Sequence, residues 1–177
     1  MRRRDPFADP APLIRRVYSY VAYRLGDGPE AEDVTSDVFE RAIRYRHTYD
    51  ETRGKPVPWL LGIARRCVSE ELANRRPASN VDTPEQASDE DLAVESVRRL
   101  TLATGLARLD EHSRDLIALR YGADLTARQI AEIVGSKTNA VEVALHRALA
   151  RLRDNLGDEL VAAPSAAKQI TPPRSAD

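Results

Sequence analysis

The polar side chains best arranged to contact a partner lie near the carboxyl end of the chain. Val141, Leu145, Ala148 and Leu152 repeat at steps of four, three and four, which predicts the inward stripe of one helix. The residues that point away from this stripe are Asn139, Glu142, Val143, His146 and Arg147. Amide, carboxylate, imidazole and guanidinium groups on one outer face can hydrogen-bond or pair electrostatically with another molecule.

The residues before this helix must position it. Thr126, with Gln129 three residues later, has the capping-box pattern of a helix start. Gly135 supplies a turn, and Ser136 or Thr138 can cap the next helix. The apolar face of the short first helix is expected at Ile130, Ala131 and Val134. A short helix, a glycine turn and a longer helix form a helix-turn-helix layout, which many proteins use to bind DNA. An ordinary helical hairpin remains the alternative for this stretch alone.

The composition favours an all-α protein of one large or two small domains. The chain has 177 residues, of which 31% are charged and 5% aromatic, and helical periodicity dominates. The single cysteine, Cys67, excludes an internal disulfide and fits a small core residue in a reducing compartment. No apolar run predicts membrane insertion, and the N-terminus does not resemble a secretory signal, so a cytoplasmic protein is expected.

Charge is segregated although the net charge is only −1. Residues 28–40 contain five acids and no base, whereas residues 53–76 contain six bases and two acids. Residues 82–95 contain six acids and no base. This segregation predicts two kinds of partner surface in the first half of the chain.

Apolar periodicity and breaker residues predict where the helices lie. The expected helices are Asp9–Leu25, Pro29 to about Tyr45, Trp59 to about Arg75 after a loop at 47–58, Val94–Ala107, Glu111–Tyr121 and the helix-turn-helix. The expected core positions of the first three are Leu13, Val17, Tyr20 or Val21; Ala31, Val34, Val38, Phe39, Ala42 and Ile43; and Leu60, Ile63, Ala64, Cys67, Val68 and Leu72. Residues 77–93 read as a flexible acidic linker, and residues 157–177 as a disordered tail.

Two segments resemble one known family. EAEDVTSDVFERAIRYR followed by DETRGKPVPWLLGIARR is similar to region 2 of bacterial RNA polymerase sigma factors of the extracytoplasmic-function (ECF) subfamily of the sigma-70 family. LARLDEHSRDLIALRYGADLTARQIAEIVGSKTNAVEVALHRALARLR resembles their region 4. The resemblance implies two small helical domains, at residues 9–76 and 94–156, joined by the acidic linker. It also implies promoter-specific transcription initiation together with core RNA polymerase.

The resemblance assigns roles to the first domain. The outer face of its second helix would bind the β′ subunit of core polymerase through Asp33, Asp37, Glu40 and Arg41. The β subunit is the other polymerase partner that the resemblance implies. The loop from Tyr45 to Lys55 and the third helix would recognise and open the −10 element. The candidate −10 residues are Arg53, Lys55, Trp59, Arg65, Arg66, Asn74, Arg75 and Arg76. Tyr45, Tyr49 or Trp59 would stack on a base or wall its pocket, and core packing is the alternative for Trp59.

The resemblance also places the second helix of the helix-turn-helix in the major groove of the −35 element. The candidate base contacts are Lys137, Thr138, Asn139, Val143 and Arg147, with His146 and Arg151 on phosphates or in packing, and Arg128 and Arg120 on the flanking backbone. This helix departs from the family at Ala140, Glu142, Val143 and Ala144, which leaves its −35 preference open. Ser69, Glu70 and Glu71 similarly replace a more basic or aromatic pattern in the third helix.

Other functions predict different partners. A conventional DNA-binding regulator would bind duplex without polymerase, usually as a dimer, and an interaction protein would occupy polymerase without reading DNA. No enzyme, cofactor or metal is expected, because the sequence lacks a glycine-rich phosphate loop and metal-ligand spacing. The single histidines are expected to be surface or packing residues: His47, His112 and His146.

The family resemblance further implies an anti-sigma factor as partner.

Overall fold

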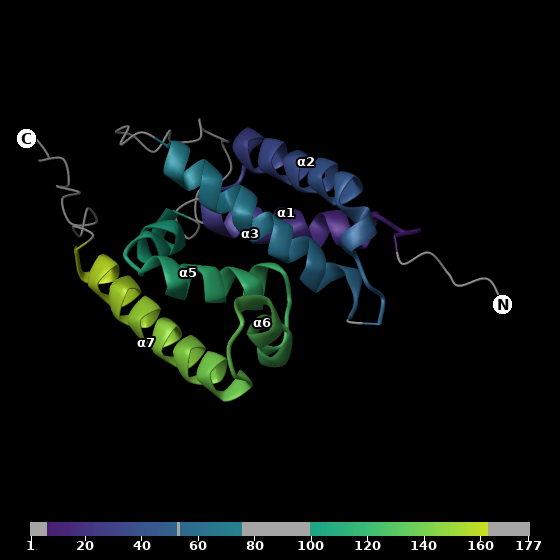
Figure 1. Ribbon diagram of the computed structural model, residues 1–177. Coiled ribbons are helices and arrows are strands. Elements are labelled where there is room, and N and C mark those ends of the chain that lie inside the picture. The colour runs from purple at the N-terminus through teal and green to yellow at the C-terminus, as the bar shows by residue number, and fades with distance from the viewer. Residues whose placement is uncertain (1–6, 53, 76–99, 163–177) are drawn as a thin grey trace, which may run out of the picture.

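The computed structural model describes residues 7–52, 54–75 and 100–162, and every regular element in these ranges is helical. The first module (residues 7–75) contains α1 (Ala11–Leu25), α2 (Pro29–Arg44), the short η1 (Arg46–Thr48) and α3 (Pro56–Asn74). The second module (residues 100–162) contains a helical segment at 100–107, α5 (Glu111–Ile117), the π-helical η2 (Ala118–Gly122), α6 (Ala127–Val134) and α7 (Thr138–Ala162). Figure 1 shows α1, α2 and α3 side by side, with α5, α6 and α7 below them.

The predicted apolar stripes form most of the core of the first module. The buried positions are Leu13, Val17, Tyr20 and Val21 of α1; Ala31, Val34, Val38 and Ala42 of α2; and Leu60, Ala64, Cys67 and Val68 of α3. Ile43 was wrongly assigned to the core, because it is 76% exposed near the end of α2. Leu61 is fully buried although it was not predicted, since α3 packs against α1 and α2 and also against α6.

Helix α3 begins three residues before the predicted start at Trp59. Pro56 is its first residue, and Pro58 lies inside the first turn. The first backbone N–H groups of a helix have no intrahelical acceptor, so two prolines there remove no helical hydrogen bond. Helix α1 begins at Ala11 rather than Asp9, with Pro10 as its N-cap residue.

The helix predicted at 111–121 changes its winding before it ends. Asp110 caps α5 by accepting the backbone N–H of Ser113, but from Ala118 the helix widens to a π turn. There the Ala123 N–H donates to the Ala118 carbonyl at 3.0 Å. Periodicity alone does not reveal such a turn, because its side chains continue the apolar face of the preceding helix.

The two modules pack against each other around one contiguous core. Helix α1 contacts η2, and α3 contacts α6. Leu116, Leu119, Leu125 and Ile130 of the second module belong to the same buried cluster as the first module's core. The predicted linker at 77–93 lies outside the described residues. Helix α7 continues beyond the predicted domain end at residue 156 to Ala162, so the tail expected from residue 157 begins as helix.

Candidate nucleic-acid interface

The first turns of α7 present an exposed polar face. Its predicted inward stripe, Val141, Leu145, Ala148 and Leu152, is buried. All six predicted contact residues of this segment are exposed: Lys137, Thr138, Asn139, Val143, His146 and Arg147. Ala140 and Glu142 are also exposed, and Val143 is 42% exposed. This face is therefore available to another molecule although the two modules are packed together.

The turn before α7 is fixed by the predicted local signals. Thr126 and Gln129 form a full capping box: the Gln129 N–H donates to Thr126 Oγ1 at 3.3 Å, and the Thr126 N–H donates to Gln129 Oε1 at 2.9 Å. Gly135 has a φ of 68°, a left-handed conformation that glycine adopts without steric cost. The layout is thus a helix-turn-helix, in which the capping box begins α6, Gly135 ends it, and α7 begins at Thr138.

The predicted flanking arginines differ in availability. Arg128 is exposed and pairs with Glu132 one turn later at 3.5 Å. Arg120 instead donates to the Leu125 carbonyl at 2.9 Å and lies over the Tyr121 ring, so it holds the loop after η2. Arg151 pairs with Asp110 at 2.8 Å, which ties α7 to the start of α5.

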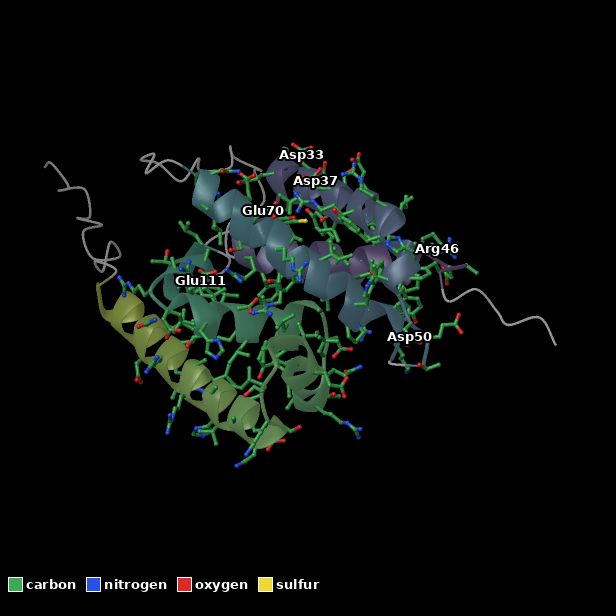
Figure 2. All side chains as sticks on the ribbon, in the orientation of Figure 1. Asp33, Asp37, Arg46, Asp50, Glu70 and Glu111 are labelled. Atoms are coloured by element: carbon green, nitrogen blue, oxygen red, sulfur yellow. The ribbon has the colours of Figure 1, made fainter. Side chains whose placement is uncertain are left out.

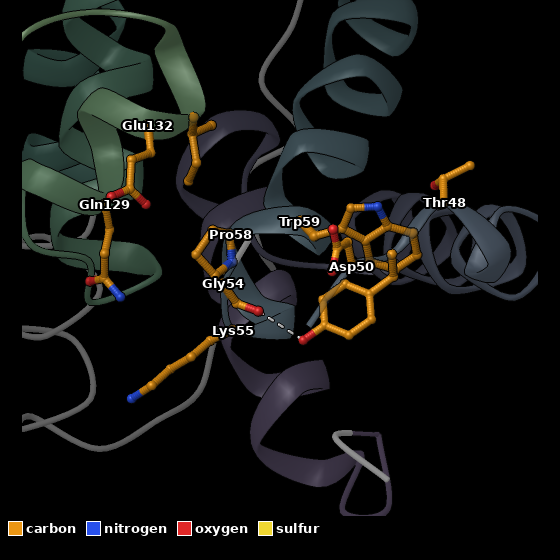
Figure 3. Close-up of a pocket in the computed structure, with 10 residues that line it drawn as sticks. Thr48, Asp50, Gly54, Lys55, Pro58, Trp59, Gln129 and Glu132 are labelled. Atoms are coloured by element: carbon orange, nitrogen blue, oxygen red, sulfur yellow. Dashed lines mark hydrogen bonds between the residues drawn. The ribbon is translucent and has the colours of Figure 1, made fainter. Parts of the chain in front are cut away.

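An aromatic cluster and a cleft lie at the predicted −10 loop. The rings of Tyr49 and Trp59 are 5.5 Å apart, and both lie edge-on to the Phe7 ring. Tyr49 donates its hydroxyl to the Gly54 carbonyl at 2.9 Å, which closes the loop (Figure 3). Trp59 is therefore both a packing residue and a wall of a cleft of about 400 Å³. The cleft is lined by Thr48, Tyr49, Asp50, Gly54, Lys55, Pro58, Trp59, Gln129, Glu132 and Ile133.

The predicted cations of this region do not form one open surface. Lys55 and Arg66 are exposed, as is Asn74. Arg75 is held by the Glu30 carboxylate and also donates to the Leu25 carbonyl at 3.0 Å. Arg53 and Arg76 lie outside the described residues.

Arg65 contacts the second module. Its Nε donates to Asp115 Oδ2 at 2.8 Å, and the same carboxylate accepts the Tyr20 hydroxyl at 2.7 Å and Arg24 at 3.0 Å. Arg24 also pairs with Glu111. Burial raises the pKa of the Tyr20 hydroxyl well above its usual value, and the charge of Asp115 raises this pKa further. Sequence analysis missed this cluster, because Asp115 lies 50 to 95 residues from the three side chains that it accepts from, and no local pattern joins them.

The outer face of α2 carries the predicted polymerase contacts. Asp33, Asp37 and Glu40 are exposed, and Figure 2 shows Asp33 and Asp37 on the side of the molecule that also carries Glu70 of α3. Arg41 donates to Glu70 at 2.7 Å, a hydrogen bond that lowers the pKa of the Glu70 carboxyl and raises that of Arg41. Cys67 lies buried beneath this pair, and burial raises the pKa of its thiol, which suits a core residue rather than a reactive one.

Among the described residues, no helix is long and apolar enough to cross a membrane.

Two protein-family models match the chain. The model described as Sigma-70 region 2 matches residues 12–77, and the model described as Sigma-70, region 4 matches residues 105–154. These ranges correspond to the two modules. They also correspond to the two segments whose sequences resemble sigma regions 2 and 4.

Solved structures of other proteins share the fold. A sigma factor RpoE, crystallised with the anti-sigma factor NepR from Bartonella quintana, superposes with a TM-score of 0.63 at 17% identity, covering 82% of this chain and 92% of that one. CnrH in complex with the cytosolic domain of CnrY gives a TM-score of 0.59 at 24% identity, covering 85% of this chain and 83% of that one.

Curated relatives are more similar in sequence. The ECF RNA polymerase sigma factor BldN of Streptomyces coelicolor is 30% identical over 81% of this chain, a match that spans 57% of the relative's length. The ECF RNA polymerase sigma factor SigK of a Mycobacterium species is 30% identical over 80% of this chain and 78% of its own length. SigD of Mycobacterium tuberculosis is 35% identical over 79% of this chain and 71% of its own length. The chain therefore belongs to the ECF group of the sigma-70 family of RNA polymerase sigma factors.

Proposed function

We propose that this chain binds core RNA polymerase and directs it to specific promoters, where the polymerase supplies all the chemistry. The observation that carries the proposal is the exposed face of α7 from Lys137 to Arg147, held by a complete helix-turn-helix in a chain of this family. The second module would read a −35 element in the major groove through this face. Such a protein would act in the cytoplasm, where bacterial promoters and polymerase are found.

The first module would supply the other two activities of an initiation factor. The exposed carboxylates of α2 and the Arg41–Glu70 pair form a strip of mixed charge, which suits a charged partner helix of core polymerase. Lys55 and Arg66, with the aromatic wall of the cleft, would hold the backbone and an unstacked base of the −10 strand. Arg65 would join them only after leaving Asp115.

An anti-sigma factor is the proposed negative partner. The RpoE and CnrH structures that share the fold each contain a second protein, NepR in one and the cytosolic domain of CnrY in the other. Those likenesses establish the fold and leave the partner of this chain to experiment. A pull-down from the native host, with the full chain as bait, would identify it.

The test is multi-round transcription with purified core polymerase and a library of genomic fragments. We expect discrete start sites that are absent with core polymerase alone. An Asp37→Lys variant should lose them through weaker polymerase binding, whereas an Asp154→Lys variant, changed at an exposed position of α7 outside the proposed surfaces, should keep them. Specific duplex binding without any polymerase-dependent start site would instead favour a conventional DNA-binding regulator.

A further inference from the structure

The contact between the two modules contains one buried carboxylate in addition to the shared apolar core. Asp115 of α5 accepts hydrogen bonds from Tyr20 and Arg24 of α1 and from Arg65 of α3, so all three bonds join one module to the other. The side chains of Asp115 and Arg24 are only 7% and 4% exposed. Water therefore cannot replace these partners while the modules remain packed.

A second, uncharged feature holds the same contact. A Cβ atom at Gly122 would lie 2.9 Å from the backbone oxygen of Ser19 and 3.1 Å from Cδ2 of Tyr23. Real Cβ atoms essentially never approach a backbone oxygen so closely. The π turn of η2 thus lies against α1 at a distance that any residue larger than glycine would increase.

The packed second module also occupies the surface proposed for the −10 strand. Arg65 donates to Asp115 instead of remaining available to a phosphate. Across the cleft from Lys55 and Pro58, α6 contributes Gln129 and Glu132 (Figure 3). A carboxylate in this position repels the phosphates of an entering strand. The face of α7 that would read the duplex is exposed in the same arrangement.

We propose that this arrangement is an autoinhibited resting state, in which the second module covers the −10 surface of the first and is held there by Asp115 and Gly122. The proposal rests on the proposed function of that surface. In this closed state the chain binds duplex through α7. It holds a single strand only after the modules separate, which frees Arg65 and removes α6 from the cleft.

The experiment measures the separation of the modules in the full-length chain. Spin labels are placed on cysteines introduced at Ser36 of α2 and Asp154 of α7, both exposed, in a Cys67→Ala background, and distances are recorded by pulsed electron resonance. The test variants are Asp115→Asn and Gly122→Ala. Their matched controls are Glu30→Gln, which loses an ion pair within the first module, and Gly62→Ala, whose added methyl group meets no atom within 4 Å.

We expect one narrow distance distribution in the parent and in both controls. Each test variant should add a longer, broader population. For Asp115→Asn the ratio of open to closed molecules should rise about tenfold, as for the loss of one hydrogen bond to a charged group. For Gly122→Ala it should rise because the added methyl group meets the backbone of α1. Far-UV circular dichroism checks that the helices persist, and Gly122→Ala provides the test if Asp115→Asn does not fold. A broad distribution in the parent would overturn the closed state. A narrow one in both test variants would overturn the claim that Asp115 and Gly122 hold it.

Binding of a short fluorescent single-stranded DNA of mixed sequence tests the covering of the −10 surface. The opened variants should bind it several-fold more tightly than the parent, and adding Arg65→Ala should remove the gain. If the modules separate without a gain in binding, the second module does not cover the strand surface. Because the distance measurement involves neither polymerase nor promoter, failure of the closed state is distinguishable from failure of the proposed function.

Discussion

Duplex binding by the helix-turn-helix should have a salt dependence set by its cations. Three cations lie on the proposed DNA-facing surface: Arg128, Lys137 and Arg147. Among the described residues no ion pair is formed by Lys137 or Arg147. The pair of Arg128 with Glu132, at 3.5 Å between side chains that are 84% and 57% exposed, is too weak to keep Arg128 from DNA. Each phosphate neutralised contributes about −0.9 to the slope of log K against log salt, so the expected slope is about −2.7.

This slope corresponds to an affinity loss of about 40-fold between 50 and 200 mM salt. Arg147→Ala should reduce the slope to about −1.8 and the loss to about 12-fold. The assay is fluorescence anisotropy of a labelled duplex titrated with the full-length chain at one fixed pH. The slope can be measured without knowing the promoter sequence, because phosphate contacts are made with any duplex.

Arg44→Ala is the matched control, since Arg44 is also exposed but lies at the end of α2 in the first module. It should leave the slope at the parent value. A parent slope near zero, or equal effects of the two substitutions, would refute the assignment of α7 as the DNA-facing helix. A slope much steeper than −2.7 would mean that cations outside this surface also bind the duplex.

Three further predictions follow from single side chains. Tyrosine in the unfolded chain ionises near pH 10, whereas the pKa of Tyr20 is raised in the folded chain. The contribution of Tyr20 to the free energy of unfolding is therefore complete below pH 10 and is lost as the pH rises toward the pKa of the folded state. Tyr20→Phe should accordingly reduce the fall in melting temperature above pH 10, and an unchanged fall would contradict this. Thr126→Ala should cost about 1 kcal/mol by removing the cap of α6, seen as a fall of about 2–4 °C in melting temperature. Gln129→Glu, which keeps the capping box, should match the parent. Glu142→Gln should strengthen duplex binding about threefold by removing a carboxylate from the DNA-facing surface, and weaker binding would indicate that Glu142 accepts a hydrogen bond from a base.

Local signals predicted most of the helices and their buried faces. The stripe of α7, the capping box at Thr126 and the turn at Gly135 depend on residues within one or two turns of each other, so their spacing in the sequence is enough to identify them. Ile43 was misassigned because periodicity cannot show where a neighbouring helix stops covering a stripe. The π turn of η2 was likewise hidden, since one extra residue in a turn leaves the apolar pattern nearly unchanged.

The candidate site was predictable only in part. The exposed face of α7 and the carboxylates of α2 follow from helical periodicity, which separates the outer side of a helix from the inner one. The position of Arg65 does not, because a basic residue on the side of a helix gives no sign of its partner. Its carboxylate is 50 positions away, and only the packing of the two modules brings them together.

Under the proposed function the guanidinium of Arg65 has two rival ligands, the carboxylate of Asp115 in its own chain and the backbone of a nucleic acid. Occupation by one excludes the other, so the two equilibria are linked and the linkage is reciprocal. A ligand that favours the separated form must raise the affinity for the strand by the same ratio by which the strand raises the affinity for that ligand. A protein arranged in this way would not need a dedicated sensor, since the promoter itself would complete the release that another ligand begins.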